Sequence, residues 1–284
     1  MKVSVIIPIY NEESDIKDCL GSLDKQNFKE LEVIVVDDGS TDNTLKVLSD
    51  LQVKNYKLQI LKQNHKGPGE ARNLGAKNSR GEILVFVDAD MTFDKNFIQE
   101  LVEPIFKGET KGTFSKNEYL ENKSNIWSIC WNINKGLPED RMHPAHYPDE
   151  QPVFRAILKE EFLKVGGFEP IGYIDDHTLS EKLGYLATAV SGANFYHKNP
   201  SSLTEVFKQA RWIGKSEYKN RKIKNESLMR IAAVVRYSIP FSLTNGIVKS
   251  IRYGIFEFLL FKIIYDLAIE ISLVNSFYKE QKYR

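Results

Sequence analysis

Residues 81–91 read Gly81-Glu-Ile-Leu-Val-Phe-Val-Asp-Ala-Asp-Met91, an apolar run that ends in two carboxylates separated by one alanine. The run from Ile83 to Val87 predicts a short strand that is buried on both faces of a sheet. Because side chains alternate along a strand, Asp88 and Asp90 would point to the same side if extended backbone continued through Ala89. Two neighbouring carboxylates either share a hard cation or reach water, and a simple turn after the strand is the plain alternative.

Strand and helix patterns alternate in the part of the chain that leads to this stretch. Strands are predicted at 3–9, 31–36, 56–61 and 83–87, and helices at 13–25, 42–51 and 69–78. Such alternation is typical of an α/β fold with a mainly parallel sheet and helices on both faces. Ligands of these sheets bind beyond the carboxyl ends of the strands.

Polar segments follow all four predicted strands at that edge. They are Tyr10-Asn-Glu12, Asp37-Asp-Gly-Ser-Thr-Asp42, the segment 64–73, and Asp88-Ala-Asp90. Turns and helix caps explain part of this pattern, but not two adjacent acids. They also do not explain Arg72, which falls in the first turn of a predicted helix, where the helix dipole disfavours a cation. The sequence therefore indicates an anion-binding site at this edge, and it contains neither a dinucleotide fingerprint nor a P-loop.

Length and composition restrict the class of protein further. The chain has 284 residues, of which 42% are hydrophobic and 27% charged, enough for a full globular core. A formal net charge of +1 predicts no general affinity for nucleic acid. Cys19 and Cys130 match no metal or redox spacing, which favours free thiols in a reducing compartment.

The start of the chain turns polar after residue 10, too early for a secretory signal, and no apolar run approaches the roughly 20 residues that cross a bilayer. We therefore expect a cytoplasmic protein. Attachment to the inner face of the cell membrane stays open.

Several motifs, in order, resemble those of the family 2 glycosyltransferases. They are residues 3–12, Val33-Ile-Val-Val-Asp-Asp-Gly-Ser-Thr-Asp42, Ala71-Arg-Asn-Leu-Gly75, Gly81 to Asp90, Val165-Gly-Gly-Phe168, and Asp175-Asp176-x-x-Leu179. The resemblance covers roughly residues 1–215 and implies the GT-A fold of nucleotide-diphospho-sugar transferases. We expect a glycosyltransferase domain at 1–225, with a nucleotide-sugar half at 1–106 and an acceptor half at 107–225.

The resemblance also implies which residues bind the donor and a divalent cation. Those expected to contact the nucleotide sugar are Pro8, Tyr10, Glu12, Asp38, Arg72, Asp88 and Ala89. Asp90 and Asp88 are expected to hold Mg²⁺ or Mn²⁺, which offsets the repulsion between carboxylates and diphosphate. His197 matches a histidine that completes the metal shell in some relatives, and a structural role is equally open.

Asp176 aligns with the general base of inverting relatives, and Asp175 stands where glutamate is usual. A helix-capping role for Asp176 is the alternative. Trp127 and Trp131 lie one helical turn apart and could stack on a saccharide or lipid-linked acceptor, or pack in a core. Lysine at 208 departs from the Gln-x-x-Arg-Trp motif of processive synthases, which favours transfer of one sugar. A nucleotidyltransferase and a non-catalytic nucleotide-sugar binding protein remain alternatives.

A helical extension is expected at 226–284. Between Arg252 and Glu270, a helical projection places Lys262 and Asp266 on a polar side, while apolar residues cover most of the remainder. The apolar face at 250–275 could contact a membrane surface, pack on the catalytic domain or pair with another subunit.

Overall fold

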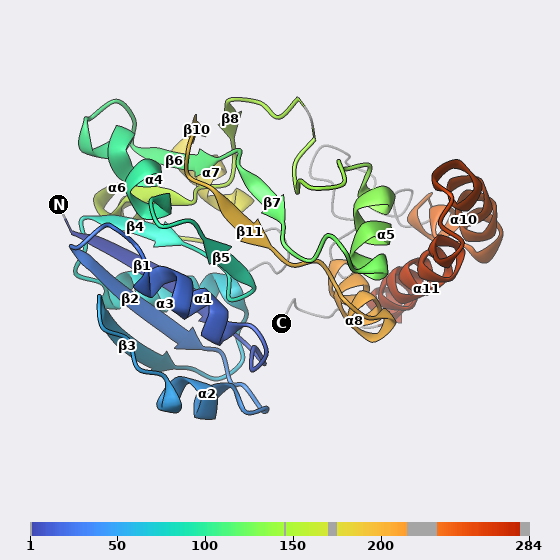
Figure 1. Cartoon of the computed structure of the whole chain (residues 1–284), viewed down its shortest axis with the longest axis horizontal. Coiled ribbons are helices and arrows are strands. Elements are labelled where there is room, and N and C mark those ends of the chain that lie inside the picture. The colour runs from blue at the N-terminus through green and yellow to red at the C-terminus, as the bar shows by residue number, and fades with distance from the viewer. Residues whose placement is uncertain (1, 145, 170–174, 215–231, 279–284) are drawn as a thin grey trace. The chain divides into compact units, whose positions relative to one another are not determined.

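The computed structural model describes residues 2–144, 146–169, 175–214 and 232–278 (Figure 1). It divides into two compact units. Of the described residues, the first contains 2–119, 146–169 and 175–197, and the second contains 120–144, 198–214 and 232–278. The domain boundary predicted at 225/226 lies outside the described residues.

The first unit is built on an eight-stranded sheet in the order β3-β2-β1-β4-β9-β6-β10-β8. Its parallel half consists of β1 (Val3–Ile9), β2 (Leu31–Asp37), β3 (Lys57–Lys62) and β4 (Ile83–Phe86). The helices between them are α1 (Ile16–Asp24), α2 (Thr44–Asp50) and α3 (Pro68–Asn78). The predicted α/β alternation is confirmed, with element ends shifted by a few residues.

The other half of this sheet is mixed. It contains β9 (Ala156–Leu158), β6 (Gly112–Ser115), β10 (Ala187–Val190) and β8 (Glu150–Gln151). β9 runs antiparallel to β4 and β6, whereas β6 and β10 are parallel. Helices α4 (Phe97–Phe106), α6 (Lys159–Lys164) and α7 (His177–Leu183) belong to the same unit.

Alternation along β1 explains why helices cover both faces of the sheet. Val5 and Ile7 lie in one core with Leu20 of α1 and Leu101 of α4. Ile6 lies in a separate core with residues of α3, α6 and α7, namely Ala76, Phe162 and Leu179. Strands buried on both faces read as continuous apolar runs, and this is why the sequence pattern was clear here.

A second, three-stranded sheet in the order β5-β11-β7 extends the polar edge of the first unit. Its strands are β5 (Met91–Phe93), β11 (Phe195–His197) and β7 (Glu118–Leu120). β5 follows directly after the two acids at 88 and 90, and it pairs antiparallel with β11, so that His197 lies opposite Met91. This pairing brings a residue more than a hundred positions away next to the acid pair.

The second unit is helical. Its elements are α5 (Ile126–Lys135), α8 (Leu203–Gly214), α10 (Ile239–Tyr253) and α11 (Glu257–Tyr278). Residues of α5, α8 and α11 share one apolar core. The predicted polar side of the last helix is not its solvent side: Lys262 and Asp266 are buried, whereas Leu260 and Leu267 are exposed. Among the described helices, none is both long and apolar enough to cross a membrane.

A buried carboxylate fastens the opposite, amino-terminal edge of the parallel strands. Glu32 on β2 accepts hydrogen bonds from the Ser4 hydroxyl on β1 and from the backbone N–H groups of Arg80 and Gly81, which precede β4. Burial raises the pKa of Glu32, but these hydrogen bonds outweigh it and lower the pKa below its ordinary value. Glu32 thus joins three strands as an anion.

Replacing Glu32 by glutamine should lower the free energy of unfolding at neutral pH by roughly 1–3 kcal/mol, since an amide cannot accept the same set of donors. The folded-state pKa lies below the unfolded value of about 4.3, so this contribution is present above that value and is lost as pH falls through the folded pKa. Urea unfolding across the acid range measures both effects. The exposed Glu30→Gln is the control, and equal loss in both variants would contradict the assignment.

Candidate functional site

The carboxyl ends of β1, β2, β3 and β4 meet at one edge, as the sequence predicted for parallel strands. After β4 the chain does not stay extended. Ala89 and Asp90 form a turn, with the N–H of Met91 donating to the Asp88 carbonyl at 3.3 Å. The expectation of extended backbone through Ala89 is therefore wrong and the turn alternative correct. Ala89 is buried, whereas the side chains of Asp88 and Asp90 remain 32% and 34% exposed.

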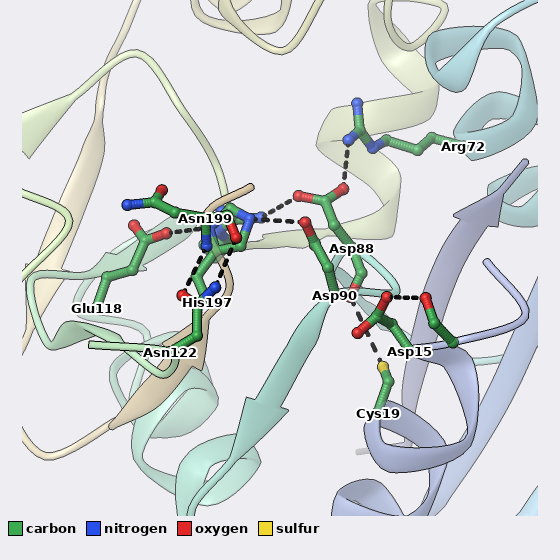
Figure 2. Close-up of polar contacts among 11 residues, drawn as sticks. Asp15, Cys19, Arg72, Asp88, Asp90, Glu118, Asn122, His197 and Asn199 are labelled. Carbon is green, nitrogen blue, oxygen red and sulfur yellow. Dashed lines mark hydrogen bonds and ion pairs between the residues drawn. The ribbon is translucent and has the colours of Figure 1, made fainter. Parts of the chain in front are cut away.

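Two arginines hold Asp88. Arg72 on α3 donates from Nη2 to Oδ1 at 2.8 Å, and Arg155, just before β9, approaches Oδ2 at 3.4 Å. Figure 2 shows Arg72 directed at the Asp88 carboxylate. Burial alone would raise the pKa of Asp88, but the two guanidinium groups lower it to about 2. Asp88 is an anion at every physiological pH.

Arg72 also reaches a second carboxylate. Its Nη1 donates to Oδ1 of Asp175 at 3.1 Å, and its guanidinium lies 5.8 Å from the centre of the Phe168 ring. Asp175 is buried, and its Oδ2 has no hydrogen-bond partner among the residues that the structure describes. Burial, together with Asp176 and Asp88, raises the pKa of Asp175 to about 6, although Arg72 opposes the rise. One guanidinium thus connects the end of β4 to the segment that enters α7.

Asp176 follows directly and immediately precedes α7, but its side chain makes no capping hydrogen bond. The helix start is satisfied instead by the Asp175 carbonyl, which accepts from the backbone N–H and the hydroxyl of Thr178. The side chain of Asp176 is 37% exposed, and Nε2 of His177 lies 3.9 Å from Oδ1. Helix capping therefore does not account for this carboxylate, which is available to a ligand.

Asp90, His197 and Glu118 form a line of three polar side chains (Figure 2). His197 Nε2 lies 3.1 Å from Asp90 Oδ2, and its Nδ1 lies 2.7 Å from Glu118 Oε1. Burial disfavours a charged imidazole, but the two carboxylates outweigh it and hold the pKa of His197 well above its ordinary value. Glu118 fixes which ring nitrogen faces Asp90, because it accepts the Nδ1–H.

Asp38, at the end of β2, has a fully occupied carboxylate. Oδ1 accepts from Gln63 Nε2 and the N–H of Lys66, and Oδ2 accepts from the N–H of Gly67 and lies 2.9 Å from His65 Nδ1. The acid therefore shapes the 63–67 loop. It also places the His65 ring, whose centre lies 4.2 Å from that of the exposed Tyr10. Contact between Asp38 and the nucleotide base stays a prediction. The exposed surface next to Asp38 belongs to the Tyr10 and His65 rings.

The two remaining donor-side candidates lie on β1 and just after it. Pro8 is half-buried within β1, opposite Val36. Glu12 donates its backbone N–H to the Thr44 hydroxyl. Burial, and then the carboxylates of Asp90, Asp15, Asp88 and Asp42, raise the pKa of Glu12 to about 9. This edge of the sheet therefore concentrates negative charge, as a cation site does.

Trp131 is buried in the second unit, where its ring packs edge-on against Phe261 and Tyr265. Trp127 is partly buried against the same core. Both tryptophans therefore pack in or against a core, which was the alternative to an acceptor contact. An acceptor contact through Trp127 stays a prediction.

Glu118, Arg155 and His65 complete the site, and sequence reasoning did not single them out. Glu118 and Arg155 lie in the stretch where no motif stood out, and only strand pairing brings them to Asp90 and Asp88. His65 follows β3 in the polar segment 64–73 that the sequence singled out, and its place in that segment was the available signal; its contact with Tyr10 appears only in the structure. Across the described ranges, no group of three or more His, Cys, Asp and Glu side chains is arranged to hold a metal unaided.

The mixed, mainly parallel sheet with helices on both faces, and with acids and an arginine at the carboxyl ends of its strands, has the arrangement of the GT-A fold. The chain belongs to glycosyl transferase family 2, whose model matches residues 4–166. It is 33% identical over 232 residues to the glycosyltransferase GlyA of Streptococcus pneumoniae, covering 75% of this chain and 32% of GlyA. It is 45% identical over 103 residues to the poly(ribitol-phosphate) beta-N-acetylglucosaminyltransferase TarS of Staphylococcus aureus, covering 35% of this chain and 18% of TarS.

Solved structures support the fold. TarS 1-349 in complex with UDP has a TM-score of 0.53 at 22% identity, covering 100% of this chain and 93% of that one. The mannosyltransferase PcManGT of Pyrobaculum calidifontis, in complex with GDP-Man and Mn²⁺, has a TM-score of 0.61 at 18% identity, covering 96% and 87%. The chain spans about a third of GlyA and about a fifth of TarS, the curated relatives compared above.

The Asp38 network predicts a loss of stability as well as of nucleotide binding in Asp38→Asn. An amide at this position would set an N–H against backbone donors of the loop, which should cost about 1–3 kcal/mol in the free energy of unfolding. Urea unfolding and UDP titration measure the two effects, with the exposed Asp50→Asn as control. If Asp38→Asn weakened UDP binding but left stability unchanged, Asp38 would contact the base and not shape the loop.

Proposed function

We propose that this protein is a metal-dependent, inverting glycosyltransferase that moves one sugar from a nucleotide-diphosphate sugar to a hydroxyl acceptor. The observation that carries the proposal is Arg72, which binds Asp88 on the donor side and Asp175 beside Asp176 at the same time. The Arg72 guanidinium thus holds Asp175, and with it the partly exposed carboxylate of Asp176, close to the carboxyl edge of the sheet. A general base and a leaving diphosphate need this proximity.

The residues present fit a divalent cation. Asp90 and His197 offer a carboxylate oxygen and an imidazole nitrogen 3.1 Å apart, Asp88 adds a carboxylate, and Glu118 fixes the histidine tautomer. Mg²⁺ and Mn²⁺ sites commonly use one or two protein ligands and complete the shell with substrate phosphates, so a smaller protein set suffices. When bound, the cation would neutralise charge on the diphosphate.

In the proposed reaction, Asp176 takes the proton of the acceptor hydroxyl as that oxygen bonds to the sugar C1. The bond between C1 and the diphosphate oxygen breaks, and its electron pair leaves with the nucleoside diphosphate. Displacement from the opposite side inverts the anomeric centre. The Arg72 and Arg155 guanidinium groups beside Asp88 contribute positive charge near the leaving group, where it stabilises the transition state more than the ground state.

The molecules bound by related proteins support a proposal for the class of donor and the class of acceptor. The solved neighbours were determined in complex with UDP, UDP-GlcNAc and GDP-Man. We propose a UDP- or GDP-linked sugar as donor and a saccharide or lipid-linked saccharide as acceptor. We also propose residues 1–225 as the transferase domain, 226–284 as its helical extension, and a cytoplasmic location.

The alternatives are less well supported. A nucleotidyltransferase needs a glycine-rich phosphate loop after the first strand, whereas Tyr10-Asn-Glu12 follows β1. A non-catalytic binding protein would not need Asp176.

Asp176→Asn should reduce sugar transfer by about 10²–10⁴-fold while donor affinity stays unchanged, because the amide preserves shape and removes the base. Product formation from UDP- and GDP-sugars measures transfer, and isothermal titration measures donor binding. Asp50→Asn is the matched control.

Full transfer by Asp176→Asn would exclude this residue as the base. A wild-type chain that binds a nucleotide sugar, but transfers it to no hydroxyl acceptor, would favour the binding-protein alternative.

A further inference from the structure

The outer face of α10 is apolar. At most of its exposed positions the helix carries large hydrophobic side chains, and Ile251 is 73% exposed. The face continues past the helix end to Phe256, which is 80% exposed, and to Leu260 in the first turns of α11. The exposed apolar residues on α10 are Ile239, Phe241, Leu243, Ile247, Val248, Ile251 and Tyr253. A contiguous apolar surface of this kind marks an interaction site.

The inner face of α10 has the opposite character. Ser242, Gly246 and Ser250 are the buried residues of the helix, and a Cβ at Gly246 would lie 2.8 Å from a methyl group of Leu259 on α11. A helix in a water-soluble domain buries its large apolar residues and exposes its small polar ones. α10 does the reverse, because its small residues face the neighbouring helix, as they do in helix pairs surrounded by lipid.

The charges of α11 are also turned inward. Lys262 Nζ binds Asp266 Oδ1 at 2.7 Å, and the Ser242 hydroxyl of α10 donates to Asp266 Oδ2 at 2.6 Å. All three residues are buried. These three polar groups therefore satisfy one another between the two helices, away from the apolar outer face.

The charges around this face are mainly positive, with the exposed Glu257 at the start of α11 as the acidic residue among them. Between Glu226 and Glu257 the sequence contains no acidic residue, and it contains four basic ones. Arg236 and Arg252 are exposed, whereas Lys249 donates to the carbonyl of Ile133. A second copy of this chain would bring like charges together, whereas anionic lipid headgroups would be attracted.

We propose that the outer face of α10 and the start of α11 lies in the interface of an anionic lipid bilayer, with Arg252 at the headgroups. The proposed contact surface spans residues 239–260 and overlaps the predicted span of 250–275 only in part. The inference does not depend on the transferase reaction, and it holds whether or not the chain transfers sugar.

Vesicle flotation of the full chain tests the proposal. We expect binding to vesicles of phosphatidylcholine with phosphatidylglycerol and little binding to phosphatidylcholine alone. Ile251→Glu/Phe256→Glu should lower the partition coefficient by about tenfold or more, since two large side chains leave the interface. The control Leu163→Glu/Leu186→Glu replaces exposed leucines of the first unit and should bind like wild type.

Two outcomes would overturn the proposal. The first is equal flotation of wild type and Ile251→Glu/Phe256→Glu, with both folded by circular dichroism. The second is an oligomer in vesicle-free buffer that this variant dissociates, which would assign the face to a second copy. Hydrogen exchange of the wild-type chain gives a check that needs no variant: anionic vesicles should slow exchange in 239–256, and unchanged exchange there would contradict the contact.

Discussion

The pairing of one arginine with two carboxylates is the constraint on which the site depends. Arg72 projects from α3 and binds Asp88 after β4 and Asp175 before α7, segments separated by almost ninety residues of chain. Its side chain is largely buried, so an unpaired guanidinium would be costly there, and both carboxylates are needed to hold it. The same pairs place Asp176 beside the acid edge. Fold and proposed chemistry thus share one ionic contact.

Charge balance around the edge follows a simple division. Arg72 and Arg155 neutralise Asp88, whereas Asp90 is balanced by His197, which Glu118 holds from the other side. Asp88 and its two arginines stay charged at physiological pH. The pair of Asp90 and His197 can exchange its proton for a cation, because imidazole and carboxylate are both metal ligands. Two acids separated by a single alanine thus have different neighbours, because Asp88 faces guanidinium groups and Asp90 faces an imidazole.

The sequence was sufficient for the parallel half of the sheet and for most of the polar edge. Strands 3–9, 31–36 and 83–87 are buried on both faces, so their apolar runs had one interpretation. The sequence was insufficient for residues whose position depends on pairing between strands that are distant in the chain. Glu118 and Arg155 carry no local motif, and β7, β9 and β11 are three-residue strands. The sequence offered the turn at Ala89 only as an alternative, because a period-two pattern assumes the extended backbone that it is used to predict.

The prediction for the last helix was wrong for a different reason. A helical projection assigns polar residues to water, but Lys262 and Asp266 pair with each other and with Ser242 inside the second unit. A projection of one helix contains no information about a neighbour that can satisfy a charge. Because the polar side of the helix faces its neighbours, Leu260 and Leu267 on the apolar side are exposed.

The central claim is that the acid edge binds a nucleoside diphosphate through a divalent cation. Thermal unfolding with UDP or GDP, with and without Mn²⁺, tests it on wild type and on Asp90→Asn. A ligand at ~100 times its dissociation constant adds about 2.7 kcal/mol of stability. We expect one nucleotide to stabilise wild type only when Mn²⁺ is present, and neither nucleotide to stabilise Asp90→Asn. Equal stabilisation without the metal, or an undiminished response in Asp90→Asn, would contradict it.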